Sequence, residues 1–304
     1  MSNAEVRVSV GSTGDVPLSL LRQYGMFEVP LDITFILKDG TIEPHSDDGS
    51  FTLDNLFQRV SETGVIPKTA APGPGVFMKI WSQYEGPIFP ITAGHELSAC
   101  YASAHAARNI LLTRTDGPQR NNIEEPWEGL GLSLGEGFPA IIAAEQFEQG
   151  ASVQEVRKTL DEVRLKTYVT ALSESTEYFA LSGKISGIQA WMGQVLHVKP
   201  CVIINEKGMI VPFRKYRTYG EAFKDLAEWA AENGPIERMA ILHTGNEQVA
   251  LDMRKAVEDI NLFDPKNIII APTRRVIASH VGKNSIGFEF IGKKRGDIYV
   301  RPPR

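Results

Sequence analysis

Short apolar runs alternate with helix-like patterns through the first half of the chain. The alternating valines of Val6–Val10 predict a strand that ends in the turn-rich segment Gly11–Asp15. Ile88–Thr92 predicts a second buried strand, followed by a helix from about residue 97 to residue 109. Repetition of strand, loop and helix is typical of a parallel sheet covered by helices on both faces. We therefore expect residues 1–165 to form an N-terminal α/β lobe.

Apolar spacing and capping residues predict the other elements of this lobe. They are a helix opened by Pro17 and running through Gln23, one strand over Phe27–Leu37, a helix over Leu53–Glu62 capped by Thr52, and helices over Gly137–Glu148 and Val153–Val163, the last capped by Ser152. The polar, turn-rich stretch 113–131 is predicted to be a surface excursion.

The pattern continues after residue 165 with different spacing. It predicts strands over Thr167–Leu172, Val198–Asn205, Ile236–His243 and Asn267–Ala271, with helices over Gly220–Glu232 and Glu247–Ile260. We expect residues 166–304 to form a second α/β lobe.

Composition narrows the functional classes. Apolar residues make up 42% and charged residues 23% of the 304 residues, as in ordinary folded proteins, and the net charge of −5 argues against a general nucleic-acid binder. Neither Cys100 nor Cys201 lies in a Cys-x-x-Cys pair, which favours a reducing compartment. With no secretory leader and no apolar run of about 18 residues, we expect a cytoplasmic protein that is not integral to a membrane.

Cofactor and metal motifs are absent from the sequence. The glycines of residues 11–14 and 131–137 match neither the phosphate-loop nor the dinucleotide-binding pattern, although an anion could bind where the second group opens a helix. The six histidines show no spacing of a known metal site. We expect no cofactor and no metal.

Hydroxyl side chains follow two of the predicted strands. Ser12 and Thr13 come after the first strand and Ser98 after the strand at Ile88–Thr92. Ligands of parallel sheets bind beyond the carboxyl ends of the strands, so these three residues are expected on one side of a crevice.

Two further polar residues complete the candidate pocket. Thr69 lies between Pro67 and Pro72, and we expect a loop stiffened by these prolines. His280 is expected at a strand end, either as a ligand group or as a partner of backbone carbonyls, and Gly282 allows close approach of the backbone. Hydroxyls and an imidazole suit the head of an acidic ligand with an apolar body.

The same residues also permit an alternative to ligand binding alone, namely a serine esterase or thioesterase. Ser98 would be the nucleophile, with His280 as its base. The Gly-x-Ser-x-Gly motif of such hydrolases is absent around Ser98, and a serine that caps a helix explains the same residue.

Six motifs in order resemble the DegV family of bacterial fatty-acid-binding proteins. They are Gly11-Ser12-Thr13-Gly14-Asp15-Val16-Pro17, Val29-Pro30-Leu31, Thr69-Ala70-Ala71-Pro72-Gly73, Leu97-Ser98-Ala99-Cys100-Tyr101-Ala102-Ser103-Ala104, Ser182-Gly183-Lys184-Ile185-Ser186 and His280-Val281-Gly282. The resemblance runs almost from end to end.

The resemblance implies two α/β lobes with a ligand tunnel near their junction. It implies that a long-chain fatty acid lies in the tunnel, with its carboxylate held by Thr69, Ser98 and His280. The same motifs add Ser12, Thr13, Ala99 and Gly282 to the expected ligand site. By this resemblance the protein performs no chemistry itself and presents the acid to a partner fatty-acid kinase.

The expected docking residues are basic. Lys184 stands where the family has an arginine that is associated with kinase docking, and Lys lacks the bidentate geometry of Arg. Arg217 belongs to a basic group that could meet an acidic partner or a phosphate, or could be solvated surface charge.

Overall fold

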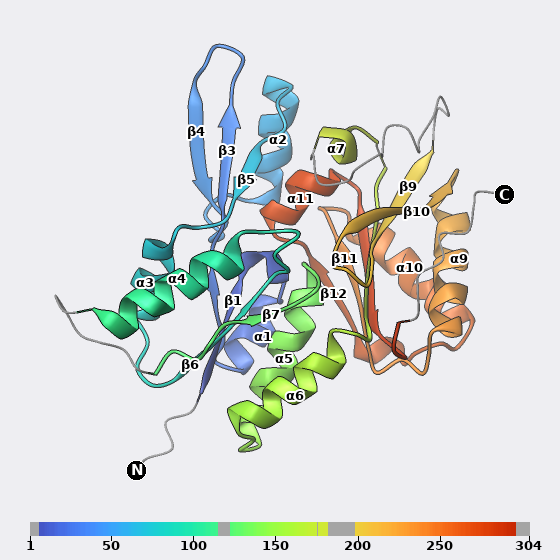
Figure 1. The fold of residues 1–304 in the computed structure, drawn as a ribbon. Helices are drawn as coiled ribbons and strands as arrows, with labels where there is room; N and C mark the ends of the chain where they lie inside the picture. Colours follow the sequence, from blue (N-terminus) through green and yellow to red (C-terminus); the bar gives the residue numbers. More distant parts are fainter. Residues whose placement is uncertain (1–5, 115–121, 175, 182–197, 296–304) are drawn as a thin grey trace.

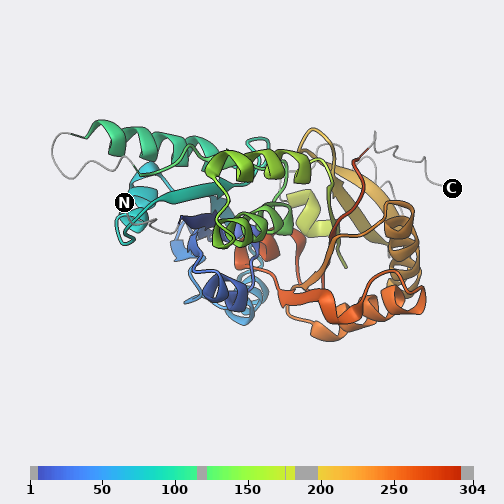
Figure 2. The ribbon, with the colours of Figure 1, turned by 90° about the horizontal axis from the view of Figure 1, so that it is seen from below.

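The described residues contain two large β-sheets and one small sheet, each packed against helices (Figure 1). A computed structural model describes residues 6–114, 122–174, 176–181 and 198–295. Most helices of the ribbon lie on the outer faces of the sheets, and the two large sheets occupy opposite halves of the molecule (Figures 1 and 2).

The first large sheet is parallel throughout, as the sequence predicts. Its strands, in the order β2-β1-β6-β7, are β1 (Arg7–Gly11), β2 (Phe27–Val29), β6 (Ile88–Thr92) and β7 (Trp127–Glu128). The turn after β1 is a single 3₁₀ turn, η1 (Ser12–Gly14). Trp127 is buried, so the stretch predicted to be a surface excursion contributes an edge strand to the core.

Both faces of this sheet are covered by helices. One face carries α1 (Leu18–Gln23), α5 (Leu134–Glu148) and α6 (Val153–Val163), and the other carries α3 (Pro74–Trp81) and α4 (Cys100–Thr113). Alternation along β1 explains the arrangement: Val8 and Val10 pack toward α5, while the Ser9 hydroxyl accepts a hydrogen bond of 3.0 Å from the Trp81 indole of α3.

The predicted single strand over residues 27–37 is wrong. It is two strands in different sheets, because Pro30 has no N–H for a ladder and Leu31 donates its N–H to the Ser12 hydroxyl (3.1 Å). The second piece, β3 (Asp32–Ile36), pairs with β4 (Ile42–Ser46) and β5 (Lys68–Ala70) in a small antiparallel sheet. Helix α2 (Leu53–Thr63) covers this sheet.

The second large sheet has six strands in the order β10-β9-β8-β13-β11-β12. They are β8 (Thr167–Leu172), β9 (Lys199–Ile204), β10 (Ile210–Tyr216), β11 (Arg238–His243), β12 (Ile268–Pro272) and β13 (Ile286–Ile291). Neighbouring strands are antiparallel except for β11 and β12. Helices α9 (Tyr219–Glu232) and α10 (Glu247–Asp259) cover one face, and η2 (Pro265–Asn267) leads into β12.

The opposite face of the second sheet meets the first part of the chain. Leu134 and Phe138 of α5 pack against Ala240 and Leu242 of β11, and Figure 2 shows α5 between the two halves of the ribbon. Two short helices, α7 (Thr176–Leu181) and α11 (Arg275–Val281), lie on this side as well, and α11 contacts the small sheet. A division of the chain at residue 165 stays a prediction.

Local capping accounts for several helix starts. Thr52 with Asn55 and Ser152 with Glu155 form reciprocal capping boxes at α2 and α6, which confirms both predicted caps. Helix α5 begins three positions before its predicted start.

No helix within the described ranges combines the length and apolar character needed to cross a membrane.

Candidate functional site

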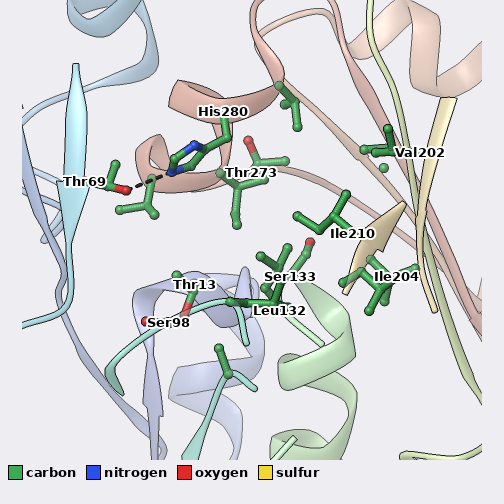
Figure 3. Close-up of a pocket in the computed structure, with 18 of the residues that line it drawn as sticks. Thr13, Thr69, Ser98, Leu132, Ser133, Val202, Ile204, Ile210, Thr273 and His280 are labelled. Carbon is green, nitrogen blue, oxygen red and sulfur yellow. Dashed lines mark hydrogen bonds between the residues drawn. The ribbon is translucent and has the colours of Figure 1, made fainter. Parts of the chain in front are cut away.

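A cavity of about 270 Å³ lies between the second sheet and the first part of the chain. The β8 and β9 side of its wall is mainly apolar: Val169, Ala171, Val202 and Ile204 line it together with Thr170. Leu132 and Thr13 contribute to the wall from the first part of the chain (Figure 3). The cavity is thus a mostly apolar space at the junction of the two sheets.

Thr69 and His280 form a polar pair on this cavity. Their Oγ1 and Nε2 atoms lie 2.8 Å apart, and both side chains are partly exposed (Figure 3). Thr69 is on β5, where pairing with Ile33 of β3 fixes it, so the expected proline-stiffened loop is a strand. His280 is in helix α11 and not at a strand end.

Ser98 and Ala99 line the same cavity at the start of α4. The Ser98 hydroxyl accepts a hydrogen bond of 3.2 Å from the N–H of Cys100, the first residue of the helix. In Figure 3 Ser98 lies apart from the Thr69–His280 pair. Ser98 therefore shares the cavity with this pair, and His280 directs its Nε2 to Thr69, which does not favour His280 as the base of an esterase.

Thr13 and Ser12 have different surroundings although they are neighbours. Thr13 lines the cavity and donates a hydrogen bond of 2.7 Å to Glu136. Ser12 is buried with its hydroxyl on the N–H of Leu31, so it fixes the backbone after Pro30. Among the described residues, those that line the cavity do not include Ser12, and the expectation that it contacts the ligand has no support in this geometry.

Gly282 is not one of the described residues that line the cavity, and its role is structural. It ends α11 with a φ of 85°, and a Cβ placed there would lie 2.5 Å from Cδ2 of Tyr178. The close approach predicted for this glycine is an approach to the Tyr178 ring. Only glycine suits both the backbone angle and the contact.

The two expected docking residues are not part of the cavity. Arg217 is exposed, and its N–H donates to Glu221 at 3.0 Å. Lys184 lies outside the described residues, as does the motif around it.

Buried carboxyl groups lie next to the cavity, and the sequence analysis did not single them out. Asp15 accepts a hydrogen bond of 2.7 Å from Ser133, and burial raises its pKa to about 8. Glu136 accepts hydrogen bonds from the Gly11 N–H (3.0 Å) and Thr13, and burial raises its pKa to about 8. Both are mainly uncharged near neutral pH and so would repel an anionic ligand little.

Two more polar side chains of the cavity were missed. Glu289 on β13 is 1% exposed and Thr273 after β12 is 5% exposed, and both line the cavity. The sequence signal for Glu289 is a single carboxylate between Phe288 and Phe290 in an apolar run. The described part of the chain contains no group of three or more His, Cys, Asp or Glu side chains placed to hold a metal ion.

Comparison with known proteins gives matches over nearly the whole chain. Residues 5–293 match the family model described as "Uncharacterised protein, DegV family". A "Fatty acid-binding protein" of Thermotoga maritima is 28% identical, with 96% of this chain and 100% of that protein covered.

Solved structures match over a similar extent. A crystal structure of a DegV lipid-binding protein from Thermotoga maritima has a TM-score of 0.77 at 27% identity, covering 96% of this chain and 100% of that chain. Another Thermotoga maritima protein, whose structure is described as revealing fatty acid binding function, has a TM-score of 0.78 at 26% identity, with 95% and 99% covered. The names of these relatives describe binding and no reaction.

Proposed function

The chain belongs to the DegV family, and from this we propose that it binds a long-chain fatty acid in the cavity, with the carboxylate at Thr69, Ser98 and His280. The observation that carries the proposal is the Thr69–His280 hydrogen bond beside an apolar cavity. When Nε2 of His280 donates to Oγ1 of Thr69, the hydroxyl proton of Thr69 is held beside the cavity and can donate to an oxygen anion.

The energetics of the apolar walls support an acyl chain. Burial of a chain of about 16 carbons at ~0.8 kcal/mol per CH₂ gains on the order of 10 kcal/mol, and association and ordering offset part of this gain. The carboxylate must meet hydrogen-bond donors, because a buried charge without partners is strongly unfavourable. Thr69, Ser98 and His280 supply such donors around one cavity.

Exposure supports one orientation of the ligand. Thr69, Ser98 and His280 are partly exposed and Ala99 is exposed, whereas the cavity residues of β8 and β9 are mainly buried. A carboxylate at the exposed polar end and an acyl chain toward the second sheet match the two ends of an amphiphile to their surroundings.

A carrier role follows from that orientation. A carboxylate held at a partly exposed site is within reach of a second protein, and we propose presentation to a fatty-acid kinase in the cytoplasm. The unpaired cysteines Cys100 and Cys201 agree with a reducing compartment.

Arg217, which is exposed, and Lys184 are the proposed docking residues. Arg217→Glu should leave fatty-acid affinity unchanged and lower acyl-phosphate formation by the kinase, and unchanged formation would remove Arg217 from the docking surface.

Mass spectrometry of denatured protein tests the binding itself. Protein purified from cells should release a long-chain fatty acid, and delipidated protein should bind hexadecanoic acid in calorimetry with one acid per chain. Preparations that are empty and bind no acid would contradict the proposal. A fluorophosphonate probe should not label Ser98, and labelling together with turnover of acyl esters would favour an esterase instead.

A further inference from the structure

Glu289 lines the cavity from β13, at one side of the wall formed by β10, β9, β8 and β13. On β13 it pairs with Val169 of β8 and Ala240 of β11. Its neighbours Phe288 and Phe290 belong to the core under α9 and α10, so alternation along the strand turns Glu289 toward the opposite face with Gly287. The side chain is 1% exposed and lines the cavity.

One carboxyl oxygen of Glu289 has no hydrogen bond. Its Oε2 is buried without a partner in the described part of the chain. Its Oε1 lies over Gly287, where a Cβ would come within 3.1 Å of it, so the glycine leaves room for the carboxyl group. Thr273, whose Oγ1 is also buried without a partner among the described residues, lines the cavity too.

The protonation state of Glu289 makes it a donor. Burial raises its pKa well above the usual range and outweighs the lowering effect of hydrogen bonds with Ser133 and with the backbone N–H groups of Leu134 and Gly135. Repulsion from the Asp15 carboxylate, whenever that group is ionised, acts in the same direction as burial. A carboxyl group that stays protonated near neutral pH presents an O–H to the cavity.

The location of this O–H is distinct from that of the Thr69–His280 pair. Glu289 interacts with Ser133, and Ser133 lies apart from the Thr69–His280 pair in Figure 3. A fatty acid whose carboxylate binds at Thr69 and His280 would therefore pass Glu289 with its chain. A saturated chain offers the Glu289 O–H no acceptor, whereas an oxygen on the chain could accept a hydrogen bond from it.

We propose that the cavity selects a fatty acid whose acyl chain carries an oxygen, as a hydroxyl or carbonyl group, that accepts a hydrogen bond from Glu289. The inference rests on the proposed function and specifies its ligand class. A neutral oxygen fits better than a second carboxylate, because the described residues lining the cavity include no lysine or arginine. Val169, Ala171 and Ile204 supply the apolar surroundings in which such a hydrogen bond is strong.

A panel of ligands tests the proposal on the whole chain. Delipidated protein is titrated with hexadecanoic acid and with hexadecanoic acids that carry one hydroxyl at successive positions. One positional isomer should bind roughly ten-fold more tightly than hexadecanoic acid. Glu289→Leu should abolish this preference and bind hexadecanoic acid at least as tightly as the unaltered protein, because the unmatched O–H is gone. Glu289→Gln, which retains a donor of the same shape, should keep the preference.

The outcomes separate this inference from the proposed function. Suppose that the unaltered protein binds hexadecanoic acid and binds every hydroxylated isomer equally or more weakly. Glu289 then does not select an oxygen on the acyl chain, and the inference is overturned while the fatty-acid function stands. If no acid binds, both fail. The comparison of ligands on the unaltered protein decides the matter even if Glu289→Leu does not fold.

Discussion

The Nε2 atom of His280 lies 2.8 Å from the Oγ1 atom of Thr69, across 211 positions of the sequence. This hydrogen bond joins β5 of the small sheet to helix α11. Each side chain limits the rotation of the other before any ligand is present. Groups that are held in place lose less conformational entropy on binding, so the pair is suited to grip a small anionic head group.

Replacement of the Thr69 hydroxyl should weaken binding of hexadecanoic acid. Thr69→Val keeps the shape and β-branching and removes one hydrogen bond to a charged group, so the dissociation constant should rise roughly ten-fold in calorimetry. Thr41→Val, on the exposed turn between β3 and β4, is the matched control and should leave the affinity unchanged. Equal affinities for both variants would exclude Thr69 from the head-group site.

The two members of the pair should act together. If Thr69 and His280 hold one carboxylate, the loss of binding energy in the double variant Thr69→Val with His280→Phe should be smaller than the sum of the single losses, by about 0.5 kcal/mol or more. The same cycle with Thr41→Val in place of Thr69→Val should be additive. Additivity in both cycles would mean that the observed hydrogen bond has no part in binding.

Gly282→Ala should destabilise the fold by about 3 kcal/mol in urea unfolding, because it combines an unfavourable backbone angle with a contact to the Tyr178 ring. Gly245→Ala is a matched control, since Gly245 has a similar φ of 88° and nothing lies within 4 Å of the added Cβ. It should cost about 1 kcal/mol. Similar losses at both positions would show that the Tyr178 contact has no effect.

The free energy of unfolding should decrease as the pH rises, because Glu136 loses its proton. Its pKa is about 8 in the folded protein against an ordinary value of 4.5, so the folded state binds the proton more tightly. Its stabilising contribution is complete below 4.5 and is lost as the pH rises toward about 8. Glu136→Gln, which imitates the protonated group, should therefore show a smaller fall in the free energy of unfolding over this range. Parallel curves for the two proteins would contradict the assignment.

Much of the fold follows from local sequence signals. The strands at Ile88–Thr92 and Thr167–Leu172 have their predicted bounds, because each is a short apolar run between breaks. The helix over Val153–Val163 also has its predicted bounds, since the Ser152–Glu155 capping box marks its start. Such signals act over a few residues and need no tertiary contact.

The parts that could not be predicted depend on contacts distant in sequence. Thr69 is a strand residue only because β3 pairs with it, and the division at Pro30 depends on the hydroxyl of Ser12. Thr69 and His280 were expected in one polar pocket, but no local pattern predicts the direct hydrogen bond between side chains 211 positions apart. Glu289 could not be recognised as a cavity residue because its strand was not predicted.

The order of synthesis gives the Thr69–His280 contact a further consequence. Thr69 leaves the ribosome long before His280, and an amino-terminal fragment that ends before residue 280 lacks the imidazole. Assembly of the pair must therefore wait until α11 has packed on the small sheet. If the head group binds there, the protein cannot hold its lipid by this pair while its carboxyl-terminal region is still being translated, and acquisition of the lipid becomes a marker of completed folding.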